Sequence, residues 1–237
     1  MPTPTDTAKE AIRILRYIEC SFPDGTNKFG SGFLGPKPGF VFTAAHVVRD
    51  NGTNASAIKV NGNKATIKSI REDIDVAVLA TAEKDVSTFG TTQSLQLGDS
   101  LMFAGHPTGV TGPSLFSGVL SAQGTNLIRS PKCRLLQING MINSGNSGGP
   151  VLAVGSLEII GAITAKYVPL LLEIDKLRDI LRSIPQFPSE VGIGKVDFSK
   201  FVNLMIQALL SVSGSLRLVQ VGIGYAIPID LFDTKSL

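Results

Sequence analysis

The sequence predicts an all-β protein built from two groups of short strands. Short apolar runs are closed repeatedly by turn-forming residues, as in the stretches PDGTN, GPKPG and NGN. Hydrophobic residues make up 43% of the chain and charged residues 17%, which supports a sizeable folded core and argues against global disorder. Two groups of short strands within 237 residues favour two small barrels or sandwiches.

Each group contains six predicted strands. The first group comprises Ile12–Glu19, Gly30–Gly35, Phe40–Val47, Ala57–Asn61, Ala65–Ile70 and Val76–Ala80. The second comprises Leu101–Gly105, Leu115–Ala122, Leu135–Ile142, Pro150–Val154, Glu158–Tyr167 and Tyr225–Ile229. The polar stretch Glu83–Gln96 lies between the groups and is typical of a linker. We therefore expect one domain over residues 1–88 and a second over residues 89–237.

Two segments interrupt the strand pattern towards the end of the chain. Apolar residues recur at helical spacing in Leu170–Ser183 and again in Phe198–Leu210. We therefore predict a helical insertion at about residues 168–213, between the last two strands of the second domain. Such helices can form a lid, a docking face or a membrane-surface element. We favour two amphipathic helices that pack on the second domain.

Composition and charge exclude several classes of function. The net charge is only +3, and no basic stripe with interleaved aromatic residues marks a nucleic-acid surface. No apolar stretch reaches the ~18 residues that a transmembrane helix needs, and no secretory leader is visible, so a cytoplasmic location is expected. Cys20 and Cys133 form no metal-binding pair, and no phosphate-binding loop appears, so we expect neither a metal nor a cofactor.

The stretch Asn143–Pro150, NSGNSGGP, places Ser147 among three glycines. The part GNSGG matches G-x-S-x-G, the nucleophile motif of the α/β-hydrolases, in which the histidine follows the serine in the chain. Both histidines of this chain, His46 and His106, precede Ser147. The α/β-hydrolase interpretation therefore fails, and the chain order His, Asp, Ser remains.

A histidine and an acid with suitable surroundings lie in the first domain. His46 follows an apolar strand end and small residues, so its imidazole is partly shielded and suited to proton transfer near neutral pH. Asp75 opens the buried strand that follows it, where an unpaired carboxylate is costly and a histidine N–H would satisfy it. Asp73 is an alternative for this acid. His106 is expected to be an ordinary turn histidine.

The motifs TAAHVV, DVAVL and GNSGGPVL contain His46, Asp75 and Ser147, in the chain order His, Asp, Ser. Together they resemble the motifs of the trypsin-like serine peptidases, and in particular of their HtrA (Deg) branch. Gly30–Phe33 and Gly224–Pro228 support the same branch. The resemblance covers roughly Ile12–Asp230, apart from the helical insertion. It implies a chymotrypsin-like fold of two six-stranded antiparallel β-barrels. This sequence departs from the branch in two ways: a helical insertion is expected in the second barrel, and the C-terminal PDZ domain that HtrA proteins usually carry is not expected.

The resemblance also assigns roles to single residues and favours Asp75 over Asp73. Ser147 is the expected nucleophile, which passes through an acyl-enzyme intermediate, and His46 is the expected general base and then acid. Asp75 orients the imidazole and stabilises its protonated form. The turn Gly145-Asn146-Ser147 is expected to form an oxyanion hole, through the N–H groups of Gly145 and Ser147.

Further positions that match the family's motifs concern substrate binding. Met141, six residues before Ser147, is expected at the base of the pocket for the residue that precedes the cleaved bond (P1), and Ile142 and Ile163 are expected to form its walls. These apolar residues predict a small or medium apolar P1 residue. Thr164 is expected to support Asp75. Thr164, Ala165 and Lys166 form the strand edge on which substrate backbone is expected to pair.

The sequence thus predicts a serine endopeptidase that acts on protein or peptide substrates. A peptidase-like fold that is inert or switched off, and that serves as a binding module, is the alternative. The complete set of expected catalytic residues favours the enzyme.

Overall fold

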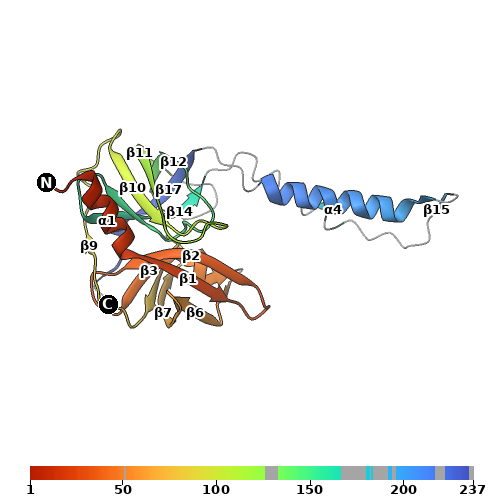
Figure 1. Cartoon of the computed structure of the whole chain (residues 1–237), viewed down its shortest axis with the longest axis horizontal. Coiled ribbons are helices and arrows are strands. Elements are labelled where there is room, and N and C mark those ends of the chain that lie inside the picture. Colours follow the sequence, from red (N-terminus) through yellow and green to blue (C-terminus); the bar gives the residue numbers. More distant parts are fainter. Residues whose placement is uncertain are drawn as a thin grey trace. The chain divides into compact units, whose positions relative to one another are not determined.

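The computed structural model describes residues 1–50, 52–125, 133–166, 180–181, 183, 192–193, 196–216 and 222–234 (Figure 1). The chain divides into two compact units. The first comprises Met1–Tyr167 together with Gly222–Leu237, and the second comprises Val168–Val221. Each unit is described by itself below.

Helix α1, Pro4–Ile14, precedes the first strand. The Thr3 side chain accepts a hydrogen bond from the Asp6 N–H, and the Asp6 carboxylate accepts one from the Thr3 N–H at 2.9 Å, which makes a capping box. Ala11 and Ile14 are buried, and the helix packs against strands of the second barrel. The predicted strand start at Ile12 is therefore wrong, because the capped helix continues to Ile14.

The first barrel contains the six strands that the sequence predicts. They are β1 (Leu15–Ser21), β2 (Asn27–Leu34), β3 (Phe40–Ala44), β6 (Ala57–Val60), β7 (Asn63–Arg71) and β8 (Val76–Ala80). They pair in the order β1-β2-β3-β8-β7-β6, and β6 returns to β1 and closes the barrel. Between β3 and β6 lie the short helix α2 (Ala45–Val48) and the hairpin of β4 (Arg49–Asp50) and β5 (Thr53–Asn54).

The second barrel also contains its six predicted strands. They are β10 (Ser100–Gly105), β11 (Ser114–Thr125), β12 (Leu135–Gly140), β13 (Pro150–Ala153), β14 (Glu158–Lys166) and β17 (Ile223–Pro228). Their order is β13-β10-β11-β12-β17-β14, and the pairing of β13 with β14 closes the barrel. β9 (Thr88–Phe89) adds to β14 in parallel, and the 3₁₀ turn η1 (Ile229–Leu231) follows β17. The predicted all-β fold with two six-stranded antiparallel barrels is confirmed.

A single hydrophobic cluster joins the two barrels. It contains Phe33 and Phe42 from the first barrel and Leu152 and Ile227 from the second. The Phe42 ring lies 5.9, 5.3 and 5.5 Å from the rings of Phe33, Phe89 and Phe232. These spacings are typical of favourable aromatic pairs. The barrels are therefore held in register by a shared aromatic core.

The second unit contains helix α4, Phe198–Leu216, which follows the short strands β15 (Gly192–Ile193) and β16 (Val196–Asp197). The predicted helix Phe198–Leu210 is thus present and longer than expected. Most of the predicted helix Leu170–Ser183 lies outside the described residues. Packing of these helices on the second barrel and the domain boundary at residue 88 stay predictions. Within the described ranges, no helix is long and apolar enough to cross a membrane.

Replacing Phe42 with alanine is expected to lower the free energy of unfolding by about 3–5 kcal/mol, because Phe42 is fully buried in the shared aromatic core. Denaturant titration measures this loss. Leu97→Ala, at an exposed position, is the control and is expected to change stability by less than about 0.5 kcal/mol. Equal losses in the two variants would show that the aromatic core does not hold the barrels together.

Candidate active site

His46 lies in α2, the single helical turn that follows β3. Its neighbours Ala45, Val47 and Val48 are buried, whereas 48% of the His46 side chain is exposed. The apolar residues thus anchor the turn in the first barrel and leave the imidazole accessible. An accessible imidazole on a fixed backbone is suited to exchanging protons with a bound substrate.

Asp75 directly precedes β8, and its carboxylate contacts the His46 ring. Asp75 Oδ2 lies 2.8 Å from His46 Nδ1, and Asp75 Oδ1 accepts the His46 backbone N–H at 2.9 Å. Because an ionised carboxylate only accepts hydrogen bonds, Nδ1 carries the imidazole proton and Nε2 is left free. Asp75 has a left-handed backbone conformation (φ 56°), which aspartate tolerates better than most residues.

Thr164, from β14 of the second barrel, completes the surroundings of Asp75. Its hydroxyl donates a hydrogen bond to Asp75 Oδ2. Both residues are buried. The two barrels therefore meet at this carboxylate, which accepts a ring N–H, a backbone N–H and a hydroxyl.

These contacts determine the pKa of Asp75. Burial alone would raise that pKa, because it disfavours the charged form. The charge of His46 and the hydrogen bonds from the His46 ring, the Thr164 hydroxyl and the His46 amide outweigh burial. Together they hold the pKa of Asp75 below its ordinary value of 3.8, so the carboxylate is ionised at neutral pH.

Asp73, the alternative acid, is turned to a different partner. Both of its carboxylate oxygens accept hydrogen bonds from the exposed side chain of Arg71, at 2.9 and 2.6 Å. The Arg71 guanidinium lowers the pKa of Asp73. The geometry therefore favours Asp75 over Asp73 as the partner of His46.

Ser147 is half-buried in the loop between β12 and β13, and both barrels hold its backbone. Its carbonyl oxygen accepts the N–H of Ser31, in β2 of the first barrel, at 2.9 Å. On the following side, the Gly148 N–H donates to the Ile163 carbonyl at 2.6 Å. A Cβ at Gly148 would overlap the Ser31 carbonyl oxygen, so only glycine allows this close approach.

Gly145 gives the same loop a second close approach. Its φ is 93°, a left-handed value that favours glycine, and a Cβ there would overlap the His106 carbonyl oxygen. The Gly145 carbonyl accepts the Ser31 hydroxyl at 2.7 Å, and the Ser144 carbonyl accepts the Thr108 N–H at 2.8 Å. These bonds fix the orientation of the two peptide groups that precede Asn146.

Two N–H groups of this loop are left open. The Asn146 N–H donates to the Asn143 carbonyl at 3.1 Å. Among the described residues, the N–H groups of Gly145 and Ser147 on either side of it have no acceptor. Two unused backbone donors flanking a serine are what stabilisation of a developing oxyanion requires.

The predicted substrate-binding residues occupy different environments. Met141 is 61% exposed, whereas Ile142 and Ile163 are buried in the hydrophobic cluster of the second barrel. Ile142 packs directly against Gly224, where a Cβ would overlap its side chain. Ala165 and Lys166 lie in β14, where they pair with β17. The roles of these five residues in specificity stay predictions.

Two residues matter more in the structure than the sequence analysis recognised. Ser31, expected to be an ordinary strand or turn serine, is fully buried and binds both Gly145 and Ser147. The Gly-Ser-Gly pattern at 30–32 was its signal, because only small residues leave room for another backbone. Asn146 is fully buried, and neither polar atom of its side chain has a partner among the described residues.

Neither cysteine competes with Ser147 as a nucleophile. Cys20 and Cys133 are both free thiols. Burial raises the pKa of Cys20 to about 12 and that of Cys133 to about 11. Since the thiolate is the reactive form, both are unreactive at neutral pH.

Comparison with known proteins identifies the family. Residues 30–161 match the model of the trypsin-like peptidase domain. The chain belongs to the trypsin-like peptidase family. This span contains His46, Asp75 and Ser147, and the resemblance predicted from the motifs is confirmed at the level of the family.

Curated relatives support the HtrA (Deg) branch. A probable periplasmic DegP-like serine endoprotease of Bartonella henselae is 33% identical over 146 residues, which cover 60% of this chain and 28% of the relative. A probable periplasmic DegP-like serine endoprotease of Rhizobium meliloti is 32% identical over 171 residues, which cover 68% of this chain and 33% of the relative. This chain therefore spans only about a third, or less, of the relatives it matches.

Solved structures show the same fold. The HtrA-type protease AlgW with a tripeptide superposes with a TM-score of 0.67 at 21% identity, over 97% of this chain and 61% of that chain. Deg5 superposes with a TM-score of 0.58 at 29% identity, covering 68% of this chain and 83% of Deg5. The peptidase fold that the resemblance implies is therefore confirmed.

The expected cytoplasmic location is wrong. The matched relatives are named as periplasmic proteins, which points to a location outside the cytoplasm. The expectation rested on the lack of an apolar leader at the start of the sequence. The start of a sequence that covers part of its relatives carries no information about location.

The depressed pKa of Asp75 predicts a pH-dependent contribution to stability. A carboxyl whose native pKa lies below its unfolded value stabilises the fold above that unfolded value, and the stabilisation is lost as the pH falls through the native pKa. The stability difference between the wild type and Asp75→Asn is therefore expected to be constant at neutral pH and to shrink below about pH 3.8. Thermal unfolding across pH 2–7 measures it.

Thr164→Val is the companion variant. It removes one hydrogen bond to Asp75 with little change in volume, and this raises the native pKa of Asp75 towards its unfolded value. The loss of stability at low pH should therefore be smaller in Thr164→Val and should end at a higher pH than in the wild type. A difference between wild type and Asp75→Asn that is independent of pH would contradict the assignment of Asp75 as an ionised, hydrogen-bonded group.

Proposed function

We propose that this chain is a serine endopeptidase with His46, Asp75 and Ser147 as its catalytic triad. The observation that carries the proposal is the loop around Ser147. The two N–H groups that flank Asn146 are open, on a backbone that Ser31 and Thr108 hold in place. An oriented His46–Asp75 pair supplies the base that such a serine needs.

The mechanism follows from this arrangement. The Ser147 hydroxyl attacks the peptide carbonyl, and His46 Nε2 takes its proton, which is possible because Nδ1 is held by Asp75. The resulting oxyanion accepts hydrogen bonds from the Gly145 and Ser147 N–H groups. His46 then returns the proton to the amine as the peptide bond breaks. A water molecule, deprotonated by His46, hydrolyses the acyl-enzyme and releases Ser147.

The open donors favour an enzyme over an inert binding module. A switched-off loop would use the Gly145 N–H internally or replace it with a carbonyl. Here the neighbouring carbonyls of Ser144 and Gly145 are both occupied, by Thr108 and Ser31. No rearrangement of the loop is therefore needed before an oxyanion binds.

Substrate class and location are part of the same proposal. We propose unfolded protein or peptide substrates with a small or medium apolar residue, such as Val, Ala, Leu or Met, before the cleaved bond. The apolar character of Met141, Ile142 and Ile163 supports this preference. The names of the relatives support action outside the cytoplasm. Activity that fractionates with the cytoplasm of the source cells would contradict that location.

Ser147→Ala is expected to reduce cleavage of unfolded casein by about 10⁴-fold or more, since loss of a triad nucleophile typically removes most of the rate acceleration. Ser144→Ala is the matched control, because its exposed side chain lies three residues from Ser147. This control should keep wild-type activity. Equal activity in the wild type and Ser147→Ala would contradict the proposed nucleophile.

The same digests test the preference for the residue before the cleaved bond. Mass-spectrometric mapping of the cleavage sites is expected to show mainly Val, Ala, Leu and Met at that position. Cleavage after Arg and Lys in most sites would contradict an apolar pocket, since burying either charge against apolar walls is costly.

A further inference from the structure

Helix α4 exposes several large apolar side chains to water. Leu204, Met205, Leu209 and Val212 are all exposed, from 44% for Leu209 to 69% for Leu204. Single exposed apolar residues are common on protein surfaces, but a group of them on one element marks a binding surface. The question is what this surface binds.

These side chains lie on one side of the helix. An α-helix turns by about 100° per residue, so Leu204, Met205, Leu209 and Val212 fall within an arc of about 140°. The exposed Ala208 lies inside the same arc. We call these five residues the apolar face of α4. It is wide and nearly flat rather than a narrow ridge.

The apolar face differs from the side of α4 that the chain itself covers. Val202, Ile206 and Leu210, each four residues apart, are only partly exposed and form a second apolar stripe. The uncharged residues Gln207 and Ser211 lie between this stripe and the apolar face. The helix therefore has its internal contact on one side and a further apolar surface on the other.

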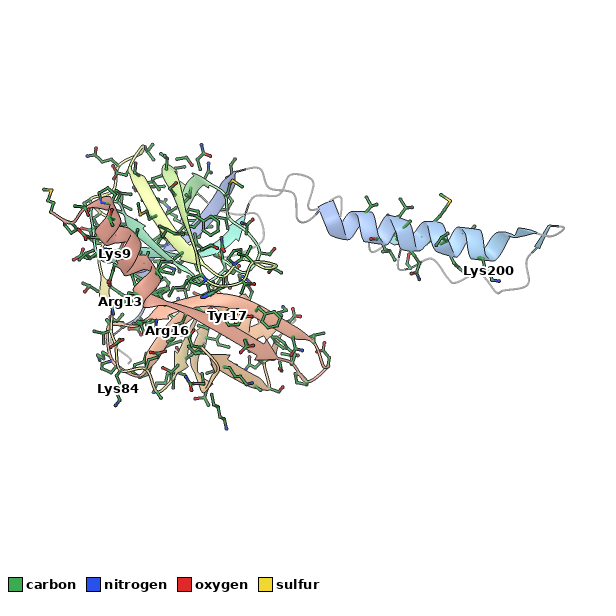
Figure 2. All side chains as sticks on the ribbon, in the orientation of Figure 1. Lys9, Arg13, Arg16, Tyr17, Lys84 and Lys200 are labelled. Atoms are coloured by element: carbon green, nitrogen blue, oxygen red, sulfur yellow. The ribbon has the colours of Figure 1, made fainter. Side chains whose placement is uncertain are left out.

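The charge pattern of α4 indicates the kind of partner. The range Phe198–Leu216 contains one charged residue, Lys200, and neither aspartate nor glutamate. Figure 2 labels Lys200 in the first turn of the helix. The other polar side chains are those of serine, asparagine and glutamine. The matching partner is therefore an apolar surface that offers no pattern of opposite charges.

A second copy of α4 fits these observations less well than a lipid surface. Met205, Leu209 and Val212 do have the spacing of a helix-pairing seam. Such a pair, however, needs three to four heptads and charged flanking residues that fix its register. The 19 residues of α4 provide fewer than three heptads, and the flanks of the apolar face carry no charge. A bilayer accepts a wide apolar face without any register.

The helix is suited to lie on a membrane rather than to cross it. Its 19 residues are about 28 Å long at about 1.5 Å per residue. As stated for the described ranges, no helix is long and apolar enough to span a bilayer. A helix with polar residues along one side and apolar residues along another binds in the plane of the interface.

We propose that the apolar face of α4 docks on the surface of a lipid bilayer and inserts between the lipid headgroups. Because α4 has a single basic residue, attachment depends on apolar burial and not on anionic lipid. The unit that carries α4 is inserted between β14 and β17, which pair at Lys166 and Gly224, where the chain leaves and re-enters the second barrel. Docking of α4 thus retains the whole chain at the membrane, and this inference goes beyond the proposed peptidase function.

Flotation of the full chain with phosphatidylcholine vesicles tests the proposal. The wild type is expected to float with the vesicles, with a partition coefficient that changes less than about 2-fold when NaCl rises from about 0.1 to about 1 M or when anionic phosphatidylglycerol is added. The double variant Met205→Gln/Leu209→Gln keeps good helix formers and is expected to bind at least about 10-fold more weakly, because two inserted side chains become polar.

The matched control is Leu97→Gln/Leu157→Gln, which makes two exposed leucines of the other unit polar. It is expected to keep the wild-type partition coefficient. Circular dichroism of the α4 double variant checks that the helix is retained. Flotation is measured without any cleavage, so its result is independent of whether the chain is a peptidase.

Four results would overturn the proposal. The first is a wild type that stays in the lipid-free fractions, and the second is binding that requires anionic lipid and is lost at high salt. The third is an oligomer, seen by sedimentation equilibrium without lipid, that the α4 double variant dissociates, since this would assign the apolar face to a second copy. The fourth is a lower unfolding temperature of the lipid-free α4 double variant, which would show that the chain itself covers this face.

Discussion

Three hydrogen bonds that cross between the barrels, two from Ser31 and one from Thr164, determine how this molecule is organised around Ser147. Ser31 of the first barrel holds the loop that carries Ser147 in the second, and Thr164 of the second barrel holds Asp75 in the first. Each barrel thus positions a functional group that belongs to the other. The two halves of the site therefore face each other correctly only when the two barrels are correctly placed against each other. The aromatic core around Phe42 holds the barrels in that arrangement.

The same constraint explains the glycines of the loop. At Gly145 and Gly148 a side chain would overlap a carbonyl oxygen of a neighbouring segment, His106 and Ser31 respectively. Because the backbones approach so closely, Ser31 and Thr108 donate hydrogen bonds to the Gly145 and Ser144 carbonyls of the loop. Two N–H groups of the loop are left without an acceptor among the described residues. A pocket of about 560 Å³, lined by Tyr17, Phe29 and the loop 106–112, arises from the same contacts, since its walls belong to the segments that make them. The position of Ser147 and the shape of the neighbouring pocket therefore depend on one set of interactions.

Much of this could be predicted from the sequence. All twelve barrel strands were predicted, because turn residues bound each apolar run, and the motifs around His46, Asp75 and Ser147 identified the family. Helix α1 was missed because Ile12 and Ile14 continue into the apolar run of β1. Its capping signal, Thr3 with Asp6, was nevertheless present in the sequence.

What remained unpredictable depends on contacts between distant residues. Ser31 and Gly145 are 114 residues apart, and the Gly-Ser-Gly pattern at 30–32 indicates room for another backbone without identifying Gly145 as the partner. Tyr17 and His106 form one wall of a pocket only because the two barrels meet there. Whether Ile142 lines an open pocket or fills it depends on how it packs against Gly224, which local sequence does not reveal.

The central claim is that Ser147 is activated in the resting protein. The most direct test is to treat the folded chain with a fluorophosphonate, which reacts only with an activated serine, and to measure the intact mass and the modified peptide. The account predicts one added phosphonyl group, located on Ser147, and none in Ser147→Ala. A folded wild-type protein that stays unmodified, or that is modified at another serine, would contradict it.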